Sequence, residues 1–194
     1  MLRGNIISLR HLNLNDVYSF VNWAKHPSVL LWDYNFYAKT DREIIEWYKW
    51  KTRNPSSHYF AVLKDNVPIG YVSLKSINNI FKRASIGIVL NPSLVNHGYG
   101  EDALKTILKY SFRDLNLNRV HLKVASYNKR ALHLYKKLGF TIIRKNLMAF
   151  PNGDFDEKNM DFLRERDNFK IIFGKTYFYA YKMELKKEDF HYEL

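Results

Sequence analysis

Residues 91–100 read Asn-Pro-Ser-Leu-Val-Asn-His-Gly-Tyr-Gly, and an amphipathic run follows them directly. The glycines at positions 98 and 100 let the backbone turn sharply and approach a ligand without a Cβ in the way. The start of a helix leaves backbone N–H groups without intrahelical partners, and such groups bind phosphate oxygens. The stretch therefore predicts a turn and then a helix over residues 98–113, with an anion site at the helix start.

A Gly-x-Gly turn alone does not identify its ligand. No Gly-Lys-Ser/Thr follows the glycines, so the turn is not a Walker loop. It is not a dinucleotide fingerprint either, because Ala103 replaces the third glycine and no ribose-binding acid is evident. The rest of the chain has to decide between a phosphate site and a plain turn.

Residues 128–140 form the second informative stretch, Asn-Lys-Arg-Ala-Leu-His-Leu-Tyr-Lys-Lys-Leu-Gly-Phe. Their spacing predicts a helix over residues 129–138, with Tyr135 on its apolar face. Gly139 fits the left-handed position after a helix. Taken alone, Asn128 is typical of a helix N-cap and Tyr135 of a core residue.

Alternation and turn residues predict the other elements. A helix capped by Asn15 or Asp16 and another capped by Thr40 or Asp41 follow the first strand, and a short helix is expected over residues 157–166. The expected strands cover residues 5–11, 58–63, 69–74, 84–90, 119–125, 140–143 and 177–185. This order predicts an α/β fold with a mixed central sheet flanked by helices.

The composition sets limits on the class of protein. The chain has 194 residues, 46% of them hydrophobic, which suffices for one domain with a sizeable core. It has no cysteine, so disulfides and thiolate metal sites are excluded, and its histidines lack metal-site spacing. No signal peptide and no apolar run of membrane-spanning length is evident, so we expect a cytoplasmic protein.

The net charge is +12, with 31 basic and 19 acidic side chains. Residues 1–97 and 98–194 each carry +6, so the chain has no basic tail. Such a field attracts anions in general, which include nucleic acid and a phosphate-rich cofactor. A solvated basic surface explains the charge equally well.

The turn at Val95–Gly100 and the Asn128–Phe140 motif, in this order, resemble the GNAT superfamily of N-acetyltransferases. Within that superfamily they resemble the branch that includes the ribosomal-protein-alanine acetyltransferases. The resemblance runs from Ile7 to Ile143 and returns at the last strand. It implies the GNAT acyl-CoA N-acyltransferase fold in a single domain over residues 1–194, with an elaboration at about residues 150–175.

The resemblance also implies roles for the matching residues, with acetyl-CoA as the cofactor. The loop N–H groups would hold the pyrophosphate of coenzyme A, the strand at 88–90 would run beside the pantetheine arm, and Tyr135 would protonate the departing thiolate. Trp32, Asp33 and Tyr34 fall where the family builds its acceptor wall, although an aromatic plug between helices is the alternative. The cofactor-binding residues implied in this way are Ile88, Val89, Leu90, Val95, Asn96, His97, Gly98, Tyr99, Gly100, Asn128, Ala131 and Tyr135.

Two positions depart from the family pattern. The phosphate loop often begins with Arg or Gln where this chain has Val95, although backbone donors can still bind. The branch often carries Glu where this chain has Ser85, so the general base stays open between a relayed water, Asp33 and His121. No residue is assigned to a metal.

We therefore expect an acetyl-CoA-dependent N-acetyltransferase that moves an acetyl group to a primary amine by direct transfer in a ternary complex. The alternatives are a non-catalytic acyl-CoA-binding regulatory module, suggested by Ser85, and a nucleic-acid-binding domain, suggested only by charge. The expected partner is a small-molecule or peptide amine acceptor, with no membrane, with nucleic acid disfavoured, and with a homodimer in prospect. Because residues 29–53 are not strongly acidic, the acceptor is expected to be neutral or anionic apart from its amine.

Overall fold

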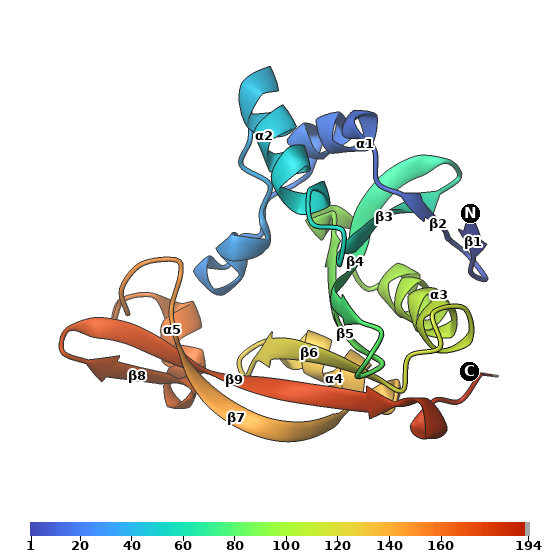
Figure 1. Ribbon diagram of the computed structural model, residues 1–194. Coiled ribbons are helices and arrows are strands. Elements are labelled where there is room, and N and C mark those ends of the chain that lie inside the picture. Colours follow the sequence, from blue (N-terminus) through green and yellow to red (C-terminus); the bar gives the residue numbers. More distant parts are fainter. Residues whose placement is uncertain (193–194) are drawn as a thin grey trace. The chain divides into compact units, whose positions relative to one another are not determined.

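The computed structural model describes residues 1–192. Contacts between residues divide the chain into two units. Unit 1 comprises Met1–Ala24, Phe36–His121 and the residues from Lys186 onward, and unit 2 comprises Lys25–Asn35 and Leu122–Leu185. Each unit has its own sheet strands and its own helices, and each is described by itself (Figure 1).

The strands of unit 1 form an antiparallel series that ends in one parallel pair. In order these strands are β1 (Leu2–Arg3), β2 (Ser8–His11), β3 (His58–Lys64), β4 (Val67–Asn78) and β5 (Arg83–Leu90). β6 (Arg119–Ala125) begins in unit 1 and runs parallel to β5, with Arg83, Ala84 and Ser85 opposite Arg119, Val120 and His121. The sheet is therefore mixed, as predicted.

The β3–β4 hairpin follows from its turn residues. Asp65 and Asn66 both have positive φ, which is the backbone of a two-residue type I′ turn. Asn and Asp tolerate this conformation better than other residues with a Cβ. β3 is buried along most of its length, so the hairpin places an apolar strand inside the sheet.

Two helices cover one face of the unit 1 sheet. α1 (Leu14–Ser19) and α2 (Asp41–Thr52) lie side by side, and the 3-10 turn η1 (Phe20–Asn22) extends α1 (Figure 1). Their core, here called the α1–α2 core, includes Leu12, Val17, Phe20, Trp23, Phe36, Ile44, Tyr59, Ala61 and Leu63. Tyr71 of β4 and Val89 of β5 pack against it, so these residues mark the sheet face that α1 and α2 cover.

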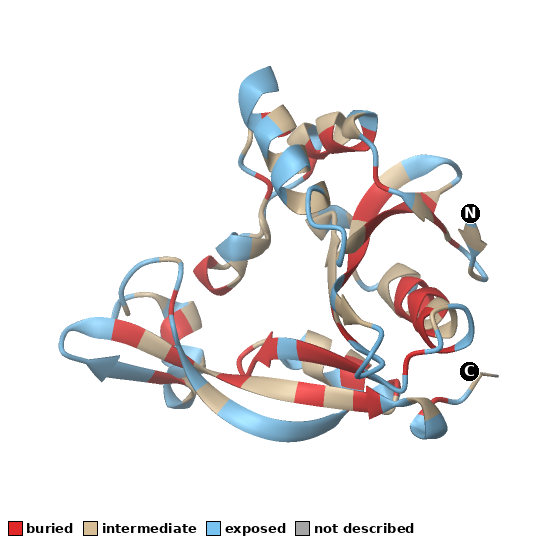
Figure 2. Cartoon of the chain, viewed as in Figure 1, coloured by how far each residue is buried: buried red, intermediate tan, exposed pale blue. Residues whose placement is uncertain are grey.

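α3 (Tyr99–Arg113) is the most buried helix of unit 1. Leu104, Ile107, Leu108 and Phe112 are fully buried, and Figure 2 shows a buried stripe along the helix. α3 contacts β1, β2, β4 and β5. The 3-10 turn η3 (Pro92–Leu94) precedes α3, and η5 (Lys187–Asp189) is the last element of the unit in sequence.

In unit 2, β9 (Lys175–Lys186) lies between the end of β6 and β7 (Thr141–Ala149), and it also pairs with β8 (Phe169–Ile172). The helical elements are η2 (Val29–Tyr34), α4 (Lys129–Lys137), α5 (Met160–Arg164) and η4 (Arg166–Asn168). The core of this unit contains Val29, Leu30, Ala125, Tyr127, Phe150, Phe162, Phe169, Phe178 and Ala180. β7 is the edge strand at this end of the sheet order, and it is almost wholly exposed (Figure 2).

Several predicted boundaries needed correction. Asn13, and not Asn15 or Asp16, caps α1, because Asn13 Oδ1 accepts the N–H of Asp16, and Asp16 at position N3 accepts the Asn13 N–H to complete a capping box. Thr40 caps α2 as predicted, and Gly139 has the predicted left-handed backbone. β8 was not predicted, because a four-residue edge strand with one buried residue lacks a clear alternation.

Residues 150–175 form part of the unit 2 core. Phe162 keeps 1% of its surface exposed, and Asn152 Nδ2 donates to the carbonyl of Val29 at 2.9 Å. Their place as an elaboration of a single domain stays a prediction. No helix within residues 1–192 is long and apolar enough to cross a membrane.

Candidate active site

The start of α3 has no side-chain cap. Gly98 is its N-cap, with φ at +80°, and no side chain bonds to the first turn. The other α-helices in the described chain are capped by side chains, namely those of Asn13, Thr40, Asn128 and Asn159. The first-turn N–H groups of α3 therefore remain available for an anionic ligand.

A buried carboxylate fixes the position of this helix start. Asp102 is 7% exposed and accepts the backbone N–H groups of Asn5, Ile6 and Ile7 at 2.9, 2.7 and 3.0 Å. A Cβ on Gly4 would come within 2.5 Å of Asp102 Oδ2, so only glycine fits beside it. Asp102 is thus bonded to the β1–β2 turn, and α3 is held in place beside the first strands.

The loop before α3 has its own internal contacts. Asn96 has positive φ, which an Asn accepts more readily than most residues. The ring of His97 makes a hydrogen bond through Nδ1 to the carbonyl of Val95 at 2.8 Å and stacks on Tyr99 at 5.8 Å between centroids. Val95–Gly100 is therefore an ordered turn.

The second candidate feature of unit 1 is the edge of β5 beyond Ser85. β6 is paired with β5 only at Arg83–Ser85, whereas β4 stays paired as far as Leu90. Ile88, Val89 and Leu90 are half-buried and keep one edge of their backbone unpaired in the described part of the chain. An extended amide-bearing chain could bond to this edge as an extra strand would.

These features fit coenzyme A. An uncapped helix start suits its pyrophosphate, and a strand edge suits the amide groups of its pantetheine arm. The fit rests on the missing cap of α3 and the early end of the β5–β6 pairing, both within unit 1.

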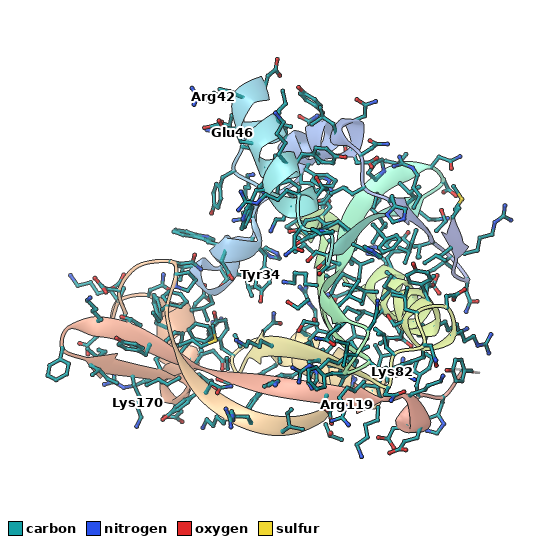
Figure 3. All side chains as sticks on the ribbon, in the orientation of Figure 1. Tyr34, Arg42, Glu46, Lys82, Arg119 and Lys170 are labelled. Carbon is teal, nitrogen blue, oxygen red and sulfur yellow. The ribbon has the colours of Figure 1, made fainter. Side chains whose placement is uncertain are left out.

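Unit 2 brings together the remaining predicted site residues. Tyr34, the last residue of η2, is labelled in Figure 3, and its hydroxyl makes a hydrogen bond with the side chain of Asn128. Burial and the neighbouring Asp33 raise the pKa of Tyr34 to about 12. Asn128 also caps α4, because Oδ1 accepts the N–H of Ala131 at 3.2 Å.

Asp33 lies beside this pair. Asp33 is an exposed residue, yet partial desolvation raises the pKa of its carboxyl group, and hydrogen bonds from Asn152 and from its own backbone oppose that rise. A raised pKa makes a carboxylate a stronger base once it is ionised. Trp32, the third predicted residue of the acceptor wall, is 43% exposed.

Tyr135 lies inside unit 2, with 8% of its surface exposed. Burial, and then the nearby Tyr34, raise the pKa of Tyr135 well above its usual value. Its ring meets Phe140 edge-on at 5.9 Å. A tyrosine in this setting holds its proton at neutral pH, so its hydroxyl is available as a hydrogen-bond donor to a developing negative charge.

Comparison with known proteins decides the family. Residues 7–141 match the family model described as "Acetyltransferase (GNAT) domain". The chain belongs to the GNAT acetyltransferase family. This GNAT enzyme is an N-acetyltransferase that uses acetyl-CoA, so the predicted activity and cofactor are confirmed.

Several relatives of this GNAT enzyme carry one name. A spermidine N(1)-acetyltransferase of Escherichia coli (strain K12) is 29% identical over 156 residues, which are 80% of this chain and 84% of the relative. One of Vibrio cholerae is 31% identical over 170 residues, which are 84% and 90%. These names do not support the predicted ribosomal-protein-alanine branch.

A solved structure shows the same fold. The crystal structure of spermidine N-acetyltransferase from Vibrio cholerae in complex with CoA and spermine superposes with a TM-score of 0.72. It covers 96% of this chain and 98% of its own, at 23% sequence identity. The GNAT fold predicted from the sequence is therefore confirmed.

The GNAT chain has a cavity of about 360 Å³ beside the start of α4. Lys129 forms an ion pair with Glu165 at 2.6 Å on its rim. Its lining residues are Ser28, Leu30, Leu31, Tyr127, Asn128, Lys129, Arg130, Asp161, Arg164 and Glu165. Both signs of charge are present, so the lining alone does not select an acceptor.

The predicted residues of this GNAT enzyme thus form two sets. Ile88–Leu90 and Val95–Gly100 lie in unit 1, whereas Trp32, Asp33, Tyr34, Asn128, Ala131 and Tyr135 lie in unit 2. His121 stands opposite Ser85, where the branch often carries Glu. Sequence reasoning missed Asn152, which bonds Asp33 from 119 positions further along the chain, because no local pattern marks such a contact.

Proposed function

We propose that this enzyme transfers the acetyl group of acetyl-CoA directly to a primary amine within a ternary complex. The observation that carries the proposal is the uncapped start of α3, preceded by a free β5 edge in the same unit. Acetyl-CoA supplies the reactive thioester. The rest of the chemistry is assigned to side chains and backbone groups of the protein.

The cofactor assignments follow the two sets. The N–H groups of Val95–Gly100 would bind the pyrophosphate, and Ile88–Leu90 would hold the pantetheine arm. In unit 2, Asn128 would donate a hydrogen bond to the cofactor through its amide, since Oδ1 already caps α4. Ala131 adds no polar group and would leave room for the cofactor beside α4.

Tyr135 would act as the general acid. Its buried hydroxyl holds its proton at neutral pH, and the departing thiolate needs one. Tyr34 lies close enough to influence the pKa of Tyr135 and is bonded to Asn128, so it would position that site.

The amine must lose a proton as it attacks. Asp33 and His121 are the two side chains offered for this step. Asp33 has a raised pKa, and His121 faces the position at which the family branch places Glu. Substituting each by Ala, with kcat measured against pH, would show which one sets the acidic limb of the profile.

Two acceptor classes are in competition. The names of the relatives support a polyamine such as spermidine. A different observation supports an anionic amine: strands β3, β4 and β5 contain no Asp or Glu, while Lys75 lies on β4. A polycation gains most from an acidic site, so a binding site along these three strands would disfavour a polycationic acceptor.

The proposal is tested through the cofactor site. Acetyl-CoA at 100 times its dissociation constant should stabilise the protein by about 2.7 kcal/mol. Gly100→Val places a branched side chain in the first turn of α3 and should remove the acetyl-CoA thermal shift, whereas Lys109→Ala, further along α3, should retain it. An undiminished shift in the Gly100 variant would show that the pyrophosphate site lies elsewhere.

A further inference from the structure

Lys51 of α2 is half-buried, and its ammonium group lies among aromatic rings. Its Nζ lies 4.0 Å from the ring centroid of Trp50, 5.2 Å from that of Trp47 and 5.9 Å from that of Tyr59. Within residues 1–192 no carboxylate pairs with Lys51 or with Lys75. Burial, and then the charge of Lys75, lower the pKa of Lys51 to about 8. Such a shift is typical of an uncompensated cation.

The nearest acids of α2 are engaged elsewhere. Glu46 pairs with Arg42 at 2.9 Å, and Figure 3 labels both on α2. Glu43 accepts the N–H groups of residues 39 and 40, and Asp41 bonds Tyr18. None of these carboxylates neutralises Lys51, and the adjoining strands β3 to β5 contain none.

Lys51 and Lys75 face the same side of the sheet. Tyr59, which lies below Lys51, stands opposite Ser73, and Lys75 is two residues further along β4. Alternate residues of a strand share a face. Tyr59, Ser73 and Lys75 therefore line the face that α2 covers.

This face reaches the proposed cofactor edge. A Cβ built on Gly87 would lie 3.8 Å from Lys75 Nζ and 3.3 Å from Ser73 Oγ. Gly87 directly precedes Ile88–Leu90. The ammonium group of Lys75 therefore lies over β5 next to the segment assigned to the pantetheine arm, and the residues involved all belong to unit 1.

We propose that this face binds a phosphate group of the amine acceptor, with Lys75 and Lys51 as its cationic ligands. An anion would offset two positive charges that have no carboxylate partner within residues 1–192, and lysine is a common phosphate ligand. Trp50 is 56% exposed and offers a ring beside the site. The inference deepens the proposed function and rests on it, since it names the acceptor class.

The first experiment measures binding without turnover. The protein is saturated with CoA, which occupies the cofactor's own phosphate site, and pyrophosphate is then titrated by calorimetry. We expect saturable binding that weakens about tenfold or more in Lys51→Met and in Lys75→Met. Lys49→Met is the matched control, because Lys49 is an exposed lysine of the same helix, and its affinity should be unchanged. No binding to the CoA-saturated protein, or an equal loss in all three variants, overturns the inference.

The second experiment uses a matched pair of acceptors. Thiol release from acetyl-CoA is compared for glucosamine, glucosamine 6-phosphate and spermidine at equal ionic strength. We expect kcat/KM to favour the phosphorylated sugar over glucosamine by about tenfold or more, and Lys75→Met to remove that preference. Equal values for the two sugars, or a preference for spermidine, contradict the inference.

The two experiments separate the claims. Pyrophosphate binding without acetylation of any amine would sink the proposed function and leave the anion site standing. Acetylation of an amine without pyrophosphate binding would support the proposed function and overturn the anion site. Pyrophosphate binding that persists only when CoA is omitted would show that the lysines serve the cofactor and not the acceptor, which also overturns the inference.

Discussion

At the scale of one residue, the proposed role of Tyr135 as general acid can be tested directly. Removing its hydroxyl should lower kcat by about 10²-fold or more and leave the KM for acetyl-CoA nearly unchanged, because the proton is needed only as the thiolate leaves. Steady-state kinetics of Tyr135→Phe would measure both constants. Tyr177→Phe, a partly buried tyrosine on β9, is the control. Equal turnover by wild type and Tyr135→Phe would return Tyr135 to a packing role.

The pH dependence follows from the same burial. The pKa of Tyr135 is raised, so its proton remains in place up to and beyond the usual tyrosine value of about 10. Loss of this proton should therefore not reduce kcat between pH 7 and pH 10. A kcat profile in that range tests the expectation. A basic limb near pH 9 that disappears in Tyr135→Phe would contradict it.

Single residues show how far local sequence can be interpreted. Asn128 was expected to cap a helix, and it does so, but its bond with Tyr34 joins two parts of the chain far apart in sequence. Nothing in the sequence around Lys51 indicated a role for this residue. Its aromatic surroundings come from α2 and β3 together, and its repulsion by Lys75 adds a third element, so only the folded chain reveals them.

At the scale of the element, Asp102 determines where α3 begins. It accepts three backbone N–H groups from the β1–β2 turn, and Ala would leave these donors, buried at Ile7 and partly buried at Asn5 and Ile6, without this partner. Asp102→Ala should cost about 3 kcal/mol of unfolding free energy and weaken acetyl-CoA binding, because the helix start would lose its anchor. Urea denaturation and thermal shift with acetyl-CoA measure these effects.

The control for this substitution lies at the other end of the helix. Asp114 is exposed and is the C-cap residue of α3, so Asp114→Ala should change stability by less than about 0.5 kcal/mol. If Asp102→Ala were as mild as this control, the anchoring role would be wrong. A loss of stability with unaltered cofactor affinity would separate the anchor from the site.

The elements predicted best are those with long periodic patterns. α3, α4 and β6 agree with expectation to within about one residue, because buried faces and glycine or asparagine boundaries mark them. β8 was also missed because the turn between β8 and β9 gives no sequence signal. This turn uses Phe173 with positive φ, a backbone that phenylalanine normally avoids. The early end of the β5–β6 pairing, on which the cofactor edge depends, is a tertiary property without a sequence signal.

At the scale of the molecule, the two units should respond separately to damage in their cores. Phe162 is 1% exposed and contacts the rings of Phe150, Phe155 and Phe169. Phe162→Ala should cost about 3–5 kcal/mol and raise amide hydrogen exchange across Leu122–Leu185 more than across Phe36–His121. A uniform rise in both units would show that they unfold as one.

The properties of the whole chain were harder to predict than its individual elements. The expected homodimer and the cytoplasmic location stay predictions. The net charge of +12 suggested an acceptor without several positive charges, whereas the relatives' names point to spermidine. Net charge cannot settle this question, because the acceptor responds to the local field, and that field depends on which acids already have partners.

The central claim is direct transfer of acetyl from acetyl-CoA to an amine, and initial-velocity kinetics test it most directly. Thiol release is measured while acetyl-CoA and an amine acceptor are varied together, and the protein is weighed after incubation with acetyl-CoA alone. We predict amine-dependent release, intersecting reciprocal plots and an unmodified protein mass, as a ternary complex requires. Parallel plots with a stoichiometric acetyl-enzyme, or no release with any amine, would contradict the account.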